Sequence, residues 1–123
     1  MTYLLDVSTL LAWLVRGHQK QAAVLAWEPG KSIAICPSTE LGFLRICCNT
    51  YGATLTDARK ALADWKAKSS PQWQPCDLPT SEGQPAPSWQ NSTDFYLANL
   101  ADKHGMKLAT LDTKLNHPAA ELI

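Results

Sequence analysis

The sequence predicts a three-layer α/β/α sandwich around a mainly parallel sheet. Short apolar runs alternate with longer amphipathic segments along the whole chain, which is typical of α/β proteins. The apolar runs show little polar alternation, as expected for strands that are covered on both faces. With 123 residues, 46% of them hydrophobic, the chain is expected to form one domain over residues 1–123.

The first half of the chain supplies two strands and three helices. In order, we expect a strand at 2–5, a helix at 7–14, a helix at 20–27, a strand at 32–36 and a helix at 37–48. Glu28-Pro29-Gly30 ends the second helix, because proline cannot continue a helix and glycine suits its cap. Pro37-Ser38-Thr39 is a helix-start signal. One apolar face of the helix that follows is expected to contain Leu41, Leu44 and Cys48, with Phe43 and Ile46 widening it.

The second half contains the remaining strands. We expect a helix at 56–68, a short strand at 73–78, a loop at 79–92, a helix from 92 to 104, a strand at 107–111 and a small edge strand at 120–123. The first of these helices has Ala58, Ala61, Leu62 and Trp65 at helical spacing. Ser92 or Thr93 can cap the helix that follows the loop.

Four acidic residues, Asp6, Glu40, Asp94 and Asp112, fall where strands end or helices begin. Each has a simple alternative explanation, since an acid near a helix N-terminus contributes roughly 0.3–1 kcal/mol to helix stability. Together, however, the four acids would share one edge of a parallel sheet, where α/β proteins bind their ligands. Clustered carboxylates repel one another unless protons or a hard cation neutralise them. We therefore expect a Mg²⁺ or Mn²⁺ site.

Such a site is suited to phosphodiester hydrolysis, because the ion can activate water and brace phosphate oxygens. Ser8, Thr93 and Thr110 lie beside the acids and are candidates to orient carboxylates or waters, although ordinary capping explains them equally well. The net charge is zero, from 11 basic and 11 acidic residues. If four acids hold metal, the 11 bases face 11 − 4 = 7 acids elsewhere, which is compatible with a phosphate-bearing substrate.

Several classes of site and location are disfavoured. Neither G-x-G-x-x-G nor G-x-x-x-x-G-K-[ST] occurs, so a dinucleotide site and a P-loop lack support. The four cysteines form no C-x-x-C pair, and reduced thiols are expected. No apolar run approaches the ~20 residues of a membrane span, and the N-terminal run lacks a basic leader. A cytoplasmic protein with no membrane partner is expected.

Three segments carry a resemblance to a known family. They are Y-L-L-D-V-S-T-L-L-A, C-P-S-T-E-L-G-F-L-R, and S-T-D-F-Y-L-A-N-L-A followed by L-A-T-L-D-T-K-L. In this order they resemble the PIN-domain ribonucleases, and within them the VapC-type toxins of bacterial toxin–antitoxin pairs. The resemblance spans almost the whole chain and implies a single PIN-like domain.

The resemblance implies a Mg²⁺- or Mn²⁺-dependent endoribonuclease that cleaves structured RNA. Its acidic residues fall on Asp6, Glu40, Asp94 and Asp112, and its neighbouring polar residues on Ser8, where asparagine is frequent in relatives, and on Thr110. It also implies a homodimer and a cognate antitoxin that occupies the active-site groove. Arg45, one turn beyond Glu40, is a candidate for a phosphate contact or a structural ion pair.

Two rival functions are also possible. A phosphatase or phosphotransferase would use Asp6 as a covalent nucleophile, but that chemistry wants a second acid two residues later, where Ser8 stands. A degenerate PIN domain would serve as a non-catalytic RNA- or protein-binding scaffold. Loss of one or more acids would be its mark, and all four acids are present.

Overall fold

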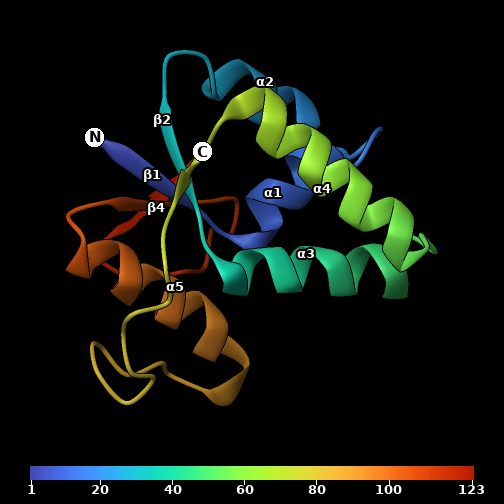
Figure 1. Ribbon diagram of the computed structural model, residues 1–123. Coiled ribbons are helices and arrows are strands. Elements are labelled where there is room, and N and C mark those ends of the chain that lie inside the picture. Colours follow the sequence, from blue (N-terminus) through green and yellow to red (C-terminus); the bar gives the residue numbers. More distant parts are fainter.

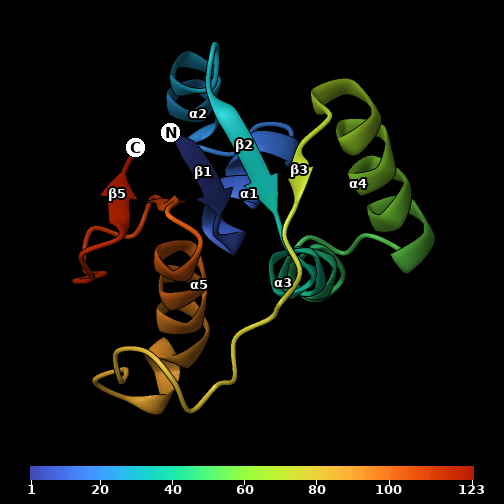
Figure 2. The ribbon, with the colours of Figure 1, turned by 60° about the vertical axis from the view of Figure 1, so that its left-hand side comes forward.

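The computed structural model describes residues 1–123 and contains one five-stranded sheet in the order β3-β2-β1-β4-β5 (Figures 1 and 2). The strands are β1 (Thr2–Leu5), β2 (Ser32–Ile35), β3 (Gln72–Trp73), β4 (Lys107–Thr110) and β5 (Ala120–Leu122). Every neighbouring pair is parallel. The predicted parallel α/β sandwich of the PIN-like type is therefore confirmed.

Helices cover both faces of this sheet. They are α1 (Val7–Leu14), α2 (Gln21–Trp27), α3 (Pro37–Asn49), α4 (Leu55–Ser69) and α5 (Ser92–Lys103), with a short 3₁₀ helix η1 (Trp89–Asn91) before α5. Figure 2 shows α4 and α5 on opposite sides of the sheet, with β1 and β2 between them. No helix has the length and apolar character needed to cross a bilayer.

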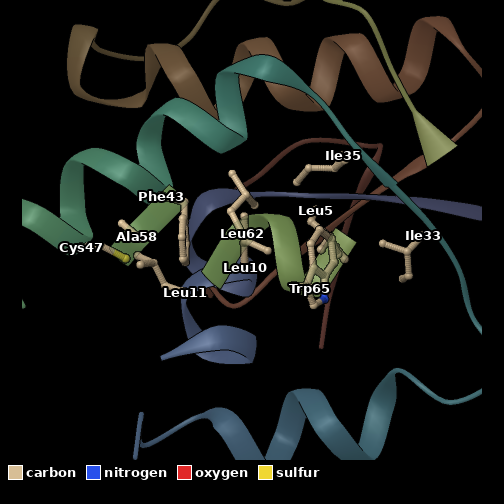
Figure 3. Close-up of a cluster of buried hydrophobic side chains, with 11 residues drawn as sticks. Leu5, Leu10, Leu11, Ile33, Ile35, Phe43, Cys47, Ala58, Leu62 and Trp65 are labelled. Atoms are coloured by element: carbon tan, nitrogen blue, oxygen red, sulfur yellow. The ribbon is translucent and has the colours of Figure 1, made fainter. Parts of the chain in front are cut away.

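The side chains of the central strands alternate between two cores. Leu5 of β1 points into a cluster with residues of α1, α3 and α4, which Figure 3 shows in close-up. Leu4, its neighbour, points the other way into a cluster with residues of α5. Both leucines are fully buried. Successive side chains of a strand point to opposite faces of the sheet, and helices cover both faces. The strands are therefore almost wholly apolar.

The chain changes direction across β1. From β1 it continues outwards to β2 and β3, and it then returns to build β4 and β5 on the other side of β1. The connections that leave the ends of β1 and β4 therefore diverge. In parallel α/β sheets such a divergence opens a crevice at the carboxyl ends of the strands, and Asp6 and Asp112 follow the two strands at this point.

The predicted strand at 73–78 is wrong in its extent. The observed strand β3 contains only Gln72 and Trp73, and one further ladder bond joins the Gln74 amide to the Ile35 carbonyl. Pro75 follows and has no N–H to donate, so pairing stops there. The edge strand at the C-terminus is confirmed as β5.

The predicted apolar face of α3 is wrong in its centre, although Phe43, expected at its margin, is buried. Thr39, Phe43 and Cys47 are buried, whereas Leu41 is 61% exposed and Leu44 is half-buried. The helix is rotated in this way because its third residue, Thr39, donates a hydrogen bond to the carbonyl at the end of β1. The leucines expected inside instead line a groove between α3 and α4.

Candidate active site

Asp6 is fixed at the carboxyl end of β1 by three hydrogen bonds. It is the N-cap of α1, and its Oδ1 accepts from the Thr9 amide and the Ser8 hydroxyl, both at 2.8 Å. Its Oδ2 accepts from the Thr110 hydroxyl at 2.5 Å. Only 2% of Asp6 is exposed. Because these three donors engage both of its oxygens, the Asp6 carboxylate is held in one orientation.

Thr110 joins the ends of the two central strands. While its hydroxyl donates to Asp6, it accepts from the Asp112 amide at 3.0 Å. The Asp112 carboxylate in turn accepts from the amide of Lys114 at 2.9 Å, which closes a short turn after β4. Ser8 adds a second link, since its hydroxyl also accepts from the Leu111 amide at 3.5 Å. Two of the predicted hydroxyls therefore orient the acids directly.

Asp94 lies in the first turn of α5 and is half-buried. No hydrogen-bond donor of the protein contacts its carboxylate. Burial, followed by the charges of Asp6 and Asp112, raises the pKa of Asp94 to about 6. Asp6 and Asp112 are thus close enough to Asp94 for their charges to raise its pKa. Their mutual repulsion is relieved by a proton on Asp94 or by a cation between them.

Glu40 has a different partner. It lies in the first turn of α3, and its carboxylate accepts from the Lys66 ammonium of α4 at 2.8 Å. The charges that raise the pKa of Asp94 are those of Asp6 and Asp112, and Glu40 is not among them. The structure therefore brings three of the four predicted acids together and turns the fourth towards α4.

Two further predicted residues lie outside this cluster. Thr93 is exposed, makes no side-chain hydrogen bond with the acids, and lines a pocket between α5 and the preceding loop. Arg45 is exposed on α3 and lines the α3–α4 groove together with Glu40 and Lys66. Arg45 makes no ion pair, so the structural alternative suggested for it is not observed.

Sequence reasoning missed how two buried threonines position the helices. Thr9 donates to the carbonyl of Ala109 at 2.9 Å, and Thr39 donates to the carbonyl of Leu5 at 2.8 Å. Each is the third residue of a helix that begins directly after a strand. Their hydroxyls thus tie the starts of the two helices to carbonyls at the strand ends. A threonine four residues after the last residue of a strand is the signal that could have identified them.

The cluster has the chemistry of a hard-cation site, although it is not a closed one. No three His, Cys, Asp or Glu side chains are grouped so tightly that all could hold one ion. Mg²⁺, however, usually takes only one or two carboxylates and keeps several waters. The donors present are all carboxylate or hydroxyl oxygens, and Asp94 has no protein donor to neutralise it. Asp6, Asp94 and Asp112 therefore fit a hydrated divalent cation.

Comparison with known proteins places the chain in a family. No family model matches the sequence. Ribonuclease VapC29 of Mycobacterium tuberculosis is 31% identical over 121 residues, which cover 95% of this chain and 90% of the relative. Ribonuclease VapC38 of the same organism is 29% identical over 119 residues, covering 89% and 84% of the two chains. The likeness spans both sequences almost from end to end, and the chain therefore belongs to the VapC family of ribonucleases.

Proposed function

We propose that this protein is a Mg²⁺- or Mn²⁺-dependent endoribonuclease and the toxin of a toxin–antitoxin pair. The observation that carries the proposal is the group of three carboxylates at the switch point of the sheet, where burial and the charges of Asp6 and Asp112 raise the pKa of Asp94. The names of the two Mycobacterium relatives support RNA as the substrate. We expect the protein to act in the cytoplasm.

Each acid has a part in the proposed chemistry. Asp6 is the fixed ligand, because Ser8, Thr9 and Thr110 hold both of its oxygens. Asp94, whose pKa is raised to about 6, would hold the cation in its ionised form and complete the negative charge of the site. Asp112 follows Thr110 on the opposite side of the crevice. A divalent ion held there would supply an activated water and bind the phosphate oxygens of RNA.

Glu40 is the fourth acid of the proposal. It begins α3 at the same edge of the sheet as the other acids, but it must leave Lys66 in order to contact the ion. Lys66 is then free to approach the phosphate backbone of the substrate. Because the pair is partly exposed, breaking it costs less than about 1 kcal/mol.

The proposed protein partner is a cognate antitoxin bound in the α3–α4 groove. This groove of about 740 Å³ has an apolar lining that includes Leu41, Leu44 and Leu55, and its charged border carries Arg45, Arg59 and Lys66. An amphipathic segment with leucine-type anchors and acidic neighbours would match both features. The groove also contains Glu40, so an occupant would cover the fourth acid of the proposal. The homodimer implied by the family remains a prediction, which light scattering of the purified protein would test.

A non-catalytic scaffold is the second candidate. It is favoured by one specific observation, the ion pair that keeps Glu40 away from the other acids. Under this alternative the groove would bind partners while no metal-dependent cleavage occurred.

Cleavage of bacterial total RNA by the purified protein tests the two candidates. The ribonuclease proposal expects cutting with Mg²⁺ or Mn²⁺, none with EDTA, and none by Asp94→Asn or Asp112→Asn. Asp64→Asn is the matched control, because Asp64 is an exposed acid of α4 whose partner is Lys60. Cutting that persists in EDTA or in both active-site variants would overturn the proposal. Metal binding and groove occupancy without any cutting would favour the scaffold.

A further inference from the structure

The segment Thr80–Ala86, which we call the strap, is fastened to α5 by one side chain. The Oδ1 of Asn99 accepts from the amide of Gln84, and its Nδ2 donates to the carbonyl of the same residue, both at 3.0 Å. Asn99 is 9% exposed. Its side-chain amide therefore pairs with both backbone groups of one residue of the strap, in the way that a neighbouring strand would.

A buried histidine fixes the orientation of the Asn99 amide. The Nε2 of His117 lies 2.8 Å from Asn99 Oδ1, and its Nδ1 accepts from the amide of Ala119 at 3.0 Å. Since the Gln84 amide already identifies Oδ1 as an acceptor, His117 must donate from Nε2 and is therefore neutral. Burial lowers the pKa of His117, while the charge of Asp102 acts in the opposite direction, so the neutral form is favoured.

The strap is shaped for this close approach. Gly83 has a φ of +86°, a conformation that other residues rarely adopt. A Cβ at this position would lie 2.5 Å from Cγ of Asn99. Both the backbone conformation and the space beside Asn99 therefore require glycine, and the clamp consists of Gly83, Gln84, Asn99 and His117.

The strap forms one wall of a pocket of about 800 Å³ beside the proposed active site. Another wall is the first turn of α5, where Thr93 and Phe95 line the pocket on either side of Asp94 in the sequence. The start of α3 contributes Pro37 and Ser38. The pocket therefore lies at the starts of the two helices that carry Glu40 and Asp94, although neither acid lines it.

The chemistry of the lining points to a neutral, polar ligand. Hydroxyl and amide groups dominate its polar part, among them Ser38, Thr80, Ser81 and Gln84. Glu82 is the single charged residue in the lining, and no cation is present to bind a phosphate. Base edges and ribose hydroxyls are ligands that such groups recognise by hydrogen bonding.

We propose that this pocket binds a nucleoside of the RNA next to the scissile phosphate, and that Asn99 and His117 are positioning residues that hold the strap as its wall. This inference rests on the ribonuclease function proposed above. Asn99 does not touch the reacting atoms. Its role is to keep the strap in place before the substrate arrives, so that binding does not have to order it.

The pocket can be tested without metal or cleavage. The ¹⁵N-labelled protein is titrated with adenosine, cytidine, guanosine and uridine, which carry no phosphate, and its amide signals are followed by NMR. We expect at least one nucleoside to shift the signals of the strap and of the first turns of α3 and α5. Asn99→Ala should abolish these shifts, and Asp94→Asn should leave them. Four nucleosides without effect, or equal shifts in Asn99→Ala, would overturn the proposal.

Exchange of the Gln84 amide hydrogen reports on the clamp itself. Losing the Asn99 bonds should speed this exchange at least about tenfold, which corresponds to roughly 1.4 kcal/mol. His117→Gln should preserve protection, because its side-chain amide can still donate to Asn99, whereas His117→Ala should not. Gln84→Ala is the matched control, since the clamp uses only the backbone of Gln84. Gly83→Ala opens the clamp from the strap side if Asn99→Ala fails to fold.

Steady-state cleavage separates positioning from chemistry. With an RNA that the wild type cuts, Asn99→Ala should raise KM about tenfold and change kcat less than about threefold. A loss confined to kcat would contradict the positioning role. If the protein binds nucleosides but cuts no RNA, the ribonuclease function proposed above is overturned, whereas the proposal that the pocket binds a nucleoside is retained. If the protein cuts RNA but binds no nucleoside, only the proposal that the pocket binds a nucleoside is overturned.

Discussion

Replacing Asp94 by asparagine should stabilise the protein at neutral pH. The pKa of Asp94 is about 6 in the folded chain, against an ordinary value of 3.8. This difference of roughly two units corresponds to about 3 kcal/mol at 1.36 kcal/mol per unit, and partial exposure to solvent reduces the expected gain to about 1–3 kcal/mol. Asparagine has nearly the same volume and carries no charge, so the variant avoids the cost of the ionised group.

The sign of the effect follows from proton binding. Between pH 3.8 and about pH 6 the folded chain holds the Asp94 proton more tightly than the unfolded chain does, so its stability falls as pH rises through this range. Asp94→Asn lacks this titration. The difference between the two proteins should therefore be near zero at pH 4 and should reach its full value above pH 7.

Urea unfolding in EDTA at pH 4, 6 and 7.5 measures this difference. Asp64→Asn serves as the control and should change the free energy of unfolding by less than about 0.5 kcal/mol, because Asp64 is an exposed partner of Lys60 in α4. Adding Mn²⁺ at 100 times its Kd should stabilise the wild type by about 2.7 kcal/mol and Asp94→Asn by much less. A variant that is less stable than wild type at pH 7.5, or a gain that does not depend on pH, would refute this account of the three carboxylates.

Three other substitutions test neighbouring parts of the account. Thr110→Val removes the hydroxyl that donates to the buried carboxylate after β1, and chemical denaturation should show a loss of about 2 kcal/mol. Lys66→Met releases Glu40, so the Mn²⁺ concentration for half-maximal RNA cleavage should fall about threefold while stability changes by less than about 1 kcal/mol. Gly42→Ala places a methyl group 2.5 Å from Cγ2 of Val7, and thermal unfolding should show a loss of about 1–3 kcal/mol that Val7→Ala largely restores.

Each of these predictions has an outcome that would contradict it. Thr113→Val, an exposed threonine in the same turn, is the control for Thr110→Val, and equal stability of the two would show that the hydroxyl bond contributes nothing. A higher Mn²⁺ requirement in Lys66→Met would mean that the lysine assists the metal site. A Gly42→Ala variant at least as stable as wild type would mean that helix propensity, worth about 1 kcal/mol, outweighs the contact between α1 and α3.

Local signals were sufficient to predict the fold. The apolar run before Asp6 and the helical spacing after it come from adjacent residues, and they correctly predicted β1 and α1. The same holds for β4 and the turn at Asp112. Because parallel sheets place strand ends at one edge, the meeting of Asp6, Asp94 and Asp112 also followed from the order of the elements.

Features that depend on tertiary contacts were not predictable in this way. Lys66 is 26 residues from Glu40, and nothing near either residue indicates that they pair. The rotation of α3 depends on a bond from Thr39 to a carbonyl of another strand, 34 residues away. Apolar periodicity alone therefore centred the face on Leu41 and Leu44, with Phe43 at its margin, whereas these leucines line the groove.

Calorimetric titration of Mn²⁺ at pH 6 tests the shared carboxylate site most directly. In two buffers with different ionisation enthalpies, the wild type should bind Mn²⁺ and release about half a proton per ion, because Asp94 with a pKa of about 6 is half-protonated there. At pH 8 the release should nearly vanish, and Asp94→Asn should bind more weakly without releasing a proton. Equal Mn²⁺ affinity in wild type and Asp94→Asn, with no proton release in either, would show that these acids do not form one metal site.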